Sequence, residues 1–123
     1  MSKYSLGIVG TRTFTNFRVF QSVLWRFRLL DNQFYRIVSG GAKGTDTLAM
    51  RYANIYNYPI RVYYPDWDKY GKAAGPIRNQ SIVNDSDVIL AFWDYESRGT
   101  KSSINFAKSV GKKVHIFDIR KGL

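Results

Sequence analysis

The stretch that decides the fold covers residues 35–57 and reads YRIVSGGAKGTDTLAMRYANIYN. It opens with a short apolar run, passes through a loop that contains Gly40, Gly41 and Gly44, and continues with apolar residues at helical spacing. A short continuous apolar run is typical of a strand covered on both faces, and a helix directly after it is typical of a βαβ unit. This stretch therefore predicts a strand, a glycine-rich turn and a helix, in that order.

The same pattern extends outward along the chain in both directions. Apolar runs punctuated by glycine alternate with helix-period segments, which indicates a parallel sheet. We expect strands over residues 4–9, 35–39, 60–64, 87–93 and 113–117, with the first and last at or beside the sheet edges. We expect helices over residues 16–30, 45–57, 76–85 and 100–110, and an irregular loop over residues 65–75.

These elements predict a single α/β domain over residues 1–123, with a Rossmann-like three-layer arrangement and a mostly parallel sheet of about five strands. Pro76 is expected as the first residue of its helix, where the missing N–H costs nothing. Gly111 is expected just past the end of the last helix.

Composition narrows the classes of function. The chain has no cysteine, so disulfides, cysteine-ligated zinc and cysteine nucleophiles are excluded. Its single histidine, His115, falls inside the last predicted strand, and we expect neither a metal nor a cofactor. The chain shows no signal peptide and no apolar run of about 18 residues, so we expect a cytoplasmic protein with no membrane contact.

The positive net charge of the chain favours an acidic partner. Nineteen Lys and Arg residues against nine Asp and Glu residues give a net charge of +10. The basic residues are scattered from Lys3 to Lys121 with no run of five, unlike a basic nucleic-acid-binding tail. The two acidic partners that must be distinguished are nucleic acid and phosphorylated small molecules.

Polar and glycine-rich clusters follow four of the predicted strands. Ligands of open parallel sheets bind beyond the carboxyl ends of the strands, where the strand order reverses. Glycine lets the backbone approach a ligand, a helix start attracts an anion, and a guanidinium is a two-pronged phosphate donor. The candidate binding residues are Gly10, Thr11, Arg12, Gly40, Gly41, Gly44, Thr45, Asp46, Trp67, Arg78, Asn79, Ser97, Arg98, Gly99 and Thr100.

Each of these clusters also has an ordinary structural interpretation. Thr45 or Asp46 could cap a helix, Ser97 to Thr100 could form a second cap, and Arg78 could be a surface charge. The glycine loop is neither a Walker A loop nor a dinucleotide fingerprint, which argues against ATP hydrolysis and NAD chemistry. Trp67, Tyr70 and Trp93 could stack on a base, although Trp93 could instead close its strand against the core.

Taken together, the motifs resemble a known family. Their order is Ser39-Gly40-Gly41-x-x-Gly44-x-Asp46, then Trp67 with residues 70–79, then Ala91-Phe92-Trp93 and Ser97-Arg98-Gly99-Thr100. This order, with its intervals, is similar to that of the YspA/YpsA-like branch of the SLOG superfamily. That superfamily is a Rossmann-like group that contains Smf/DprA and the LOG phosphoribohydrolases, and the resemblance covers nearly the whole chain.

The resemblance implies a crevice that binds a nucleotide or a nucleotide-derived ligand. By this resemblance, the three glycines of the loop would shape the crevice. Arg78 would contact phosphate or ribose, and Gly99 and Thr100 would bind phosphate at a helix start. The chain departs from the LOG motif, which has a glutamate where this sequence has Ser103 and a glycine where it has Ser97. A serine cannot stabilise an oxocarbenium-like centre as a carboxylate does.

We therefore expect a sensor or sequestering protein without turnover, and we assign no catalytic residue. Two alternatives stay open: a hydrolase of a nucleoside phosphate or N-glycosidic bond, and a Smf/DprA-like binder of single-stranded nucleic acid. We also expect a homo-oligomer, as the resemblance implies. Phe17, Trp25 and Leu29 lie outside the main apolar stripe of the first helix and could form its interface.

Overall fold

The computed structural model describes residues 4–31 and 34–121, without the side chains of residues 29–31. The strands are β1 (Tyr4–Gly10), β2 (Phe34–Gly40), β3 (Ile60–Tyr63), β4 (Val88–Trp93) and β5 (Lys113–Asp118). The helices are α1 (Phe17–Asp31), α2 (Thr45–Tyr56), α3 (Trp67–Tyr70), the 3-10 turn η1 (Gly71–Ala73), α4 (Ala74–Asn84) and α5 (Arg98–Ser109).

The five strands form one sheet in the order β3-β2-β1-β4-β5, and every pair is parallel. The predicted α/β class and parallel sheet are confirmed. The expectation that the first strand lies at or beside an edge is wrong, because β1 is central. The chain winds outward from β1 to β3 and then returns to place β4 on the other side of β1, so the strand order reverses there.

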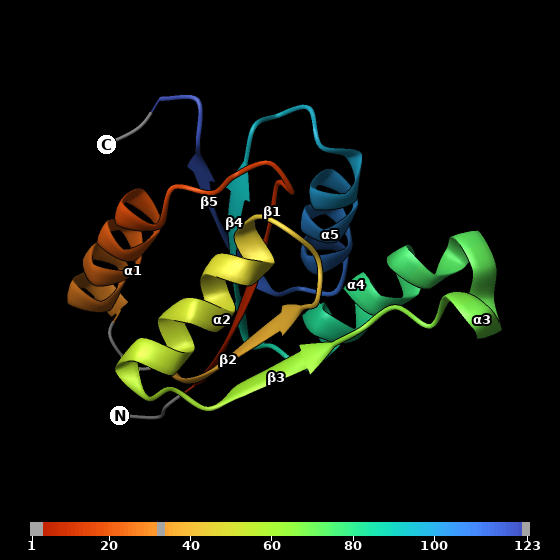
Figure 1. Cartoon of the computed structure of the whole chain (residues 1–123), viewed down its shortest axis with the longest axis horizontal. Helices are drawn as coiled ribbons and strands as arrows, with labels where there is room; N and C mark the ends of the chain where they lie inside the picture. The colour runs from red at the N-terminus through yellow and green to blue at the C-terminus, as the bar shows by residue number, and fades with distance from the viewer. Residues whose placement is uncertain (1–3, 32–33, 122–123) are drawn as a thin grey trace.

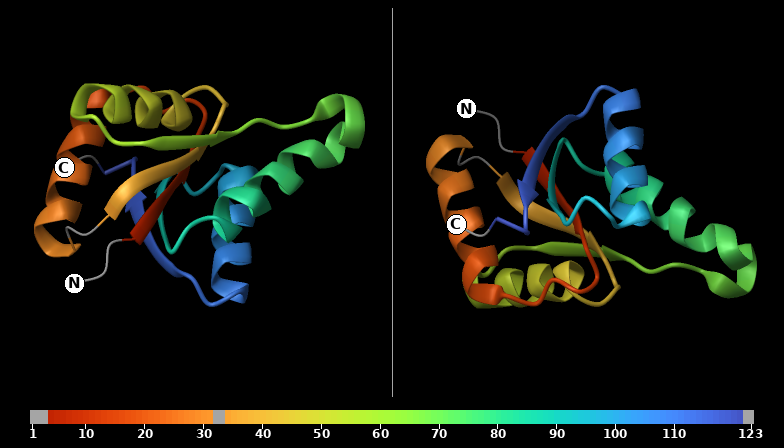
Figure 2. Two further views of the ribbon diagram at one scale, coloured as in Figure 1. Left: turned by 90° about the horizontal axis from the view of Figure 1, so that it is seen from below. Right: turned by 90° about the horizontal axis from the view of Figure 1, so that it is seen from above.

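Helices cover both faces of the sheet (Figures 1 and 2). The helices α1 and α2 lie on one face, and α4 and α5 lie on the other. Side chains alternate along β1, so Leu6 and Ile8 join the core under α1 and α2, while Val9 joins the core under α4 and α5. Burial on both faces explains why the strands are apolar at consecutive positions.

The helices follow the predicted apolar stripes closely. On α1 the stripe of Phe20, Val23, Leu24 and Phe27 is buried, and the predicted member Leu30 lies outside the described side chains. The predicted inner residues of α2 are also buried, except for Tyr56, which is half exposed. No helix within residues 4–31 and 34–121 is long and apolar enough to cross a membrane.

The segment over residues 65–75 is more regular than expected. Asp66 accepts a hydrogen bond from Lys69 N at 3.1 Å and so caps α3, which is followed by η1. Pro76 is the third residue of α4, not the first as expected. The N–H groups of the first helical turn have no partner inside the helix, so a proline at this position costs no helical hydrogen bond. We call residues 66–73 the arm, because this segment extends away from the sheet (Figure 1).

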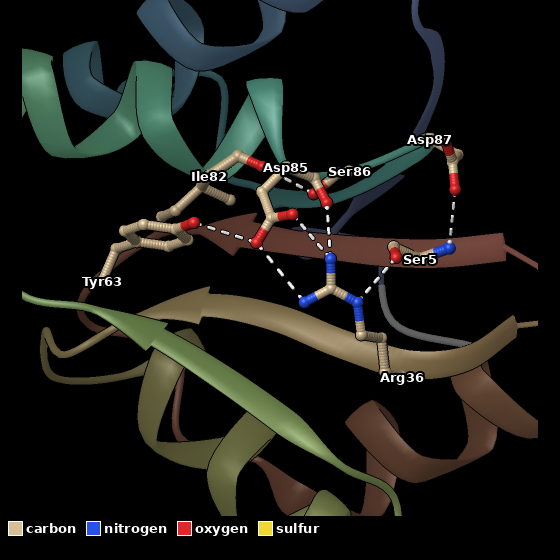
Figure 3. A network of polar contacts seen from close by, with 7 residues as sticks. All are labelled: Ser5, Arg36, Tyr63, Ile82, Asp85, Ser86 and Asp87. Atoms are coloured by element: carbon tan, nitrogen blue, oxygen red, sulfur yellow. Dashed lines mark hydrogen bonds and ion pairs between the residues drawn. The ribbon is translucent and has the colours of Figure 1, made fainter.

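A network of hydrogen bonds centred on Arg36 ties the sheet to the end of α4 (Figure 3). Arg36 Nη2 donates to Asp85 Oδ1 at 2.6 Å, and Arg36 Nε donates to Ser5 Oγ at 2.8 Å. The Tyr63 hydroxyl donates to the other carboxylate oxygen of Asp85 at 2.9 Å. The hydrogen bond from Arg36 lowers the pKa of the Asp85 carboxyl, and the same bond raises the pKa of Arg36.

Candidate functional site

A cavity of about 510 Å³ lies at the carboxyl ends of β1 and β2, bounded by the glycine loop, the β3–α4 segment and the start of α5. It brings together many of the residues predicted from sequence: Gly10, Arg12, Gly41, Asp46, Trp67, Arg78, Asn79, Ser97, Gly99 and Thr100. It does not bring together all of them, since Thr11, Gly40, Gly44, Thr45 and Arg98 are absent from the lining.

Thr11 and Thr45 lie behind the cavity wall and join secondary-structure elements. Thr45 is fully buried, and both its backbone N–H and its hydroxyl donate to the Thr11 carbonyl, at 3.3 and 2.9 Å. Thr11 in turn donates through its backbone N–H to Phe92 O at 2.9 Å, and its hydroxyl accepts from Asp94 N at 3.2 Å. These two threonines therefore fix β1, α2 and β4 around the cavity.

Two glycines of the loop are required by close contacts. Gly44 has a φ of 73°, and a Cβ there would overlap the Arg12 carbonyl oxygen. A Cβ on Gly40 would lie 2.5 Å from Arg78 Nη1 and 2.8 Å from Asp46 Oδ2. The guanidinium of Arg78 and the carboxylate of Asp46 thus both pack directly against the backbone of Gly40, where a side chain would not fit.

Arg78 lies in the first half of α4 and turns its guanidinium toward β2. Its Nε donates to Asn79 Oδ1 at 2.8 Å. Its Nη1 is buried and has no hydrogen-bond partner within the part of the chain that the structure describes. Burial lowers the pKa of Arg78, nearby Asp46 opposes that shift, and Arg12 adds to it. The guanidinium remains a cation, and an anionic acceptor would satisfy its unpaired donor.

Asp46 holds the glycine loop from inside. The side chain is only 7% exposed, and its two oxygens accept from Ser39 Oγ at 3.3 Å and from Ala42 N at 3.2 Å. Burial raises the pKa of Asp46, although the bond from Ala42 and the charge of Arg78 oppose the shift. Asp46 does not cap α2, because Gly44 occupies the cap position with no side-chain hydrogen bond.

The start of α5 is capped by its own side chains. Ser97 Oγ accepts from Thr100 N at 3.3 Å and lies 3.0 Å from Thr100 Oγ1. Thr100, which the resemblance assigned to phosphate together with Gly99, therefore has its N–H occupied, and the residue is only 4% exposed. Helical geometry still leaves the N–H groups of Arg98 and Gly99 without a partner inside the helix.

Ser103, the position at which the resemblance leads one to expect a glutamate, does not line the cavity. It is buried, and its hydroxyl donates to the Gly99 carbonyl at 3.1 Å. Among the described residues that line the cavity, Asp46 is the only carboxylate. This arrangement can hold an anion, and it offers no pair of carboxylates for acid and base catalysis.

The structure adds residues that sequence reasoning missed. Lys43 lies in the glycine loop and lines the cavity with an exposed side chain, so three cations face one carboxylate there. Its position between Gly41 and Gly44 was a signal that could have identified it. The other additions are Val9, Ala42, Pro65, Gly75, Pro76, Ile82 and Ser102.

No family model matches the sequence. The gene 61 protein of Mycobacterium phage D29 is 36% identical over 81 residues, a match that covers 61% of this chain and 65% of that protein. DNA processing protein A from Helicobacter pylori, which binds single-stranded DNA, superposes with a TM-score of 0.70 at 21% identity. That superposition covers 94% of this chain and 65% of the other. The chain thus spans about two thirds of each relative, and it shares the α/β fold of DNA processing protein A.

Proposed function

We propose that the cavity binds the phosphate of a nucleotide or nucleotide-derived ligand, and that the protein acts as a sensor or sequestering protein. The observation that carries this proposal is the buried Nη1 of Arg78, which has no partner within the described residues. A buried donor left unpaired costs free energy, and a phosphate oxygen is the acceptor that a guanidinium binds best. The binding of such a ligand recovers that cost.

The surroundings of Arg78 support the same ligand class. Arg12 and Lys43 add positive charge at the exposed side of the cavity, and the first turn of α5 presents backbone N–H groups. A volume of about 510 Å³ suits a small molecule of nucleotide size. Binding without turnover is favoured because Asp46 is engaged by the glycine loop and Ser103 is turned away.

Calorimetric titration with AMP, UMP and adenosine tests this function. We expect AMP and UMP to bind and adenosine to bind much more weakly, because adenosine lacks the phosphate that pairs with Arg78. Failure of every phosphorylated probe to bind at millimolar concentration would contradict the proposal. Incubation of the bound nucleotides followed by chromatography checks for hydrolysis, which we do not expect.

A second candidate function is the binding of single-stranded nucleic acid. It is favoured by the fold shared with DNA processing protein A and by the net charge of +10. The shared fold also supports membership of the SLOG superfamily, and the YspA/YpsA-like branch is our proposal within it. In this second function the same cavity would hold one phosphate of a longer chain.

Salt dependence separates the two candidates. An oligonucleotide bound through six or more phosphates loses about a thousandfold in affinity or more between roughly 50 and 200 mM salt. A mononucleotide held by Arg78 and backbone N–H groups loses far less. The measurement is a pair of affinity series against salt, one with AMP and one with a twelve-nucleotide single strand. Tight oligonucleotide binding at 200 mM salt without AMP binding would favour the second candidate.

We also propose a homo-oligomer, a cytoplasmic location and a single ligand-binding domain over residues 1–123. Of the residues assigned to the subunit interface, Trp25 is 60% exposed and suits that role. Phe17 instead packs against the core, and the Arg51 guanidinium lies over the Phe17 ring at 4.1 Å from the ring centroid. The Leu29 side chain lies outside the described residues. Sedimentation at micromolar concentration tests the oligomer, and a monomer of 14.2 kDa would contradict it.

A further inference from the structure

Two tryptophans have nearly the same exposure, and each lines a cavity in a different part of the molecule. Trp25 is 60% exposed and Trp67 is 58% exposed. Trp25 lies on α1, which covers the opposite face of the sheet from α4 and α5 (Figure 2). It lines a separate cavity of about 560 Å³ between α1 and α2, which contains no residue with an unpaired buried polar atom among the described residues. Trp67 begins α3 on the arm and lines the same cavity as Arg78. An indole ring that is open to solvent at the wall of a ligand cavity needs an explanation that folding does not provide.

Packing accounts for little of the Trp67 ring. Every residue of the arm is exposed. The outer edge of the indole lies near Gly75, because a Cβ placed on that glycine would be 3.7 Å from it. A large apolar side chain is costly to leave in water, so this ring is placed where a flat apolar ligand group can cover it.

Charge divides the cavity into two ends. Arg12, Lys43 and Arg78 gather around the glycine loop and β2, where only the Asp46 carboxylate faces them among the described lining residues. The arm carries two carboxylates and two lysines, which cancel: Asp66, Asp68, Lys69 and Lys72. The guanidinium end therefore suits a phosphate, and the arm end suits an uncharged aromatic group.

We propose that Trp67 is the platform on which the base of the bound nucleotide stacks, with the phosphate directed inward to Arg78; this inference rests on the proposed function. Stacking uses the face of a base, which every base has, so the site accepts purines and pyrimidines alike. The ligand class is an aromatic nucleoside phosphate or one such unit of a longer chain. A sugar phosphate without a base lacks the group that covers Trp67.

The test compares AMP, UMP and ribose 5-phosphate by calorimetry in the wild type and in Trp67→Ala. We expect the substitution to weaken AMP and UMP about tenfold to a hundredfold and to leave ribose 5-phosphate unchanged. Trp25→Ala is the matched control for an exposed tryptophan, and Tyr70→Ala is the control for an exposed ring on the arm. Both controls should bind all three probes as the wild type does.

Fluorescence gives a second readout that does not depend on the alanine variant folding. In Trp25→Phe, AMP should quench the tryptophan emission and ribose 5-phosphate should not, and adding Trp67→Phe should remove the quenching. Equal affinity for AMP in Trp67→Ala and the wild type, or no quenching by bound AMP, would overturn the platform and leave the phosphate site intact. No binding of any phosphorylated probe to the wild type would overturn both proposals.

Discussion

Two arginine–aspartate pairs occupy opposite ends of one face of β2. Arg36 and Gly40 point to the same face of this strand, since side chains alternate, and Arg78 rests over Gly40. At the amino end, Arg36 is paired with Asp85 at 2.6 Å (Figure 3). At the carboxyl end, Arg78 lies near Asp46 with its Nη1 unpaired within the described chain.

The titration of the two carboxyls reflects this difference. Hydrogen bonding from Arg36 lowers the pKa of Asp85, whereas burial raises the pKa of Asp46 even though Arg78 is near. The first pair is complete within the protein, so it stabilises the fold. The second pair is incomplete within the described chain, which supports our proposal that a ligand completes it. The same residue types thus differ in how far their hydrogen bonds are satisfied, and this difference is the basis of the roles that we propose for them.

Arg78→Ala should have the largest effect on binding. We expect AMP affinity to fall about tenfold to a hundredfold, which corresponds to roughly 1.5–3 kcal/mol for a charge-assisted phosphate contact. The change in stability should be small, because the loss of the Nε bond to Asn79 and of the charge beside Asp46 is offset by removal of a buried Nη1 that has no partner among the described residues. Calorimetry and urea denaturation of the same preparation measure both quantities. Unchanged affinity would remove Arg78 from the site.

Arg36→Ala should show the reverse pattern. It breaks the bonds to Asp85 and Ser5, so we expect a loss of about 1–2 kcal/mol in the free energy of unfolding. AMP affinity should stay at the wild-type value, because Arg36 does not line the cavity. A fall in AMP affinity as large as that of Arg78→Ala, in a variant that is still folded, would erase the distinction between the two pairs.

The pH dependence of stability should show a smaller effect, with opposite signs at the two carboxyls. The lowered pKa of Asp85 contributes stability that is present above its ordinary value of 3.8 and is lost as the pH falls through the folded-state value. The raised pKa of Asp46 makes stability fall as the pH rises from 3.8 through its folded-state value.

Asp85→Asn and Asp46→Asn test this pair of signs. Asp85→Asn should reduce the loss of stability in acid, and Asp46→Asn should reduce the decline above pH 3.8. Urea denaturation of each variant and the wild type from acid to neutral pH measures the difference. If the free energy of unfolding depended on pH in the same way for Asp46→Asn and the wild type, ionisation of the buried Asp46 carboxyl would not destabilise the fold, which would contradict this prediction.

Sequence reasoning placed the elements well because their signals are local. The apolar runs and glycines located every strand to within about one residue at each end, as the Rossmann-like pattern allows. The central place of β1 was missed because strand order depends on contacts between distant segments. The arm was missed because its helix is short and depends on one cap, the bond between Asp66 and Lys69.

The candidate site was predictable in outline and not in detail. Glycines and polar residues after the strands located the cavity, because the carboxyl ends of parallel strands share one edge. Sequence could not show that Thr45 bonds to the Thr11 carbonyl, since that contact joins residues far apart in the chain. It likewise could not separate Arg36 from Arg78, because both are single arginines within regular elements and only their partners differ.

The most direct test of this difference is the NMR spectrum of arginine side chains during titration with AMP. With ¹⁵N-labelled arginine, the Arg78 and Arg36 signals can be assigned from the spectra of Arg78→Lys and Arg36→Lys. We predict that AMP shifts the guanidinium signals of Arg78 and leaves those of Arg36 in place. A shift at Arg36, or an unmoved Arg78 while AMP binds, would contradict the account.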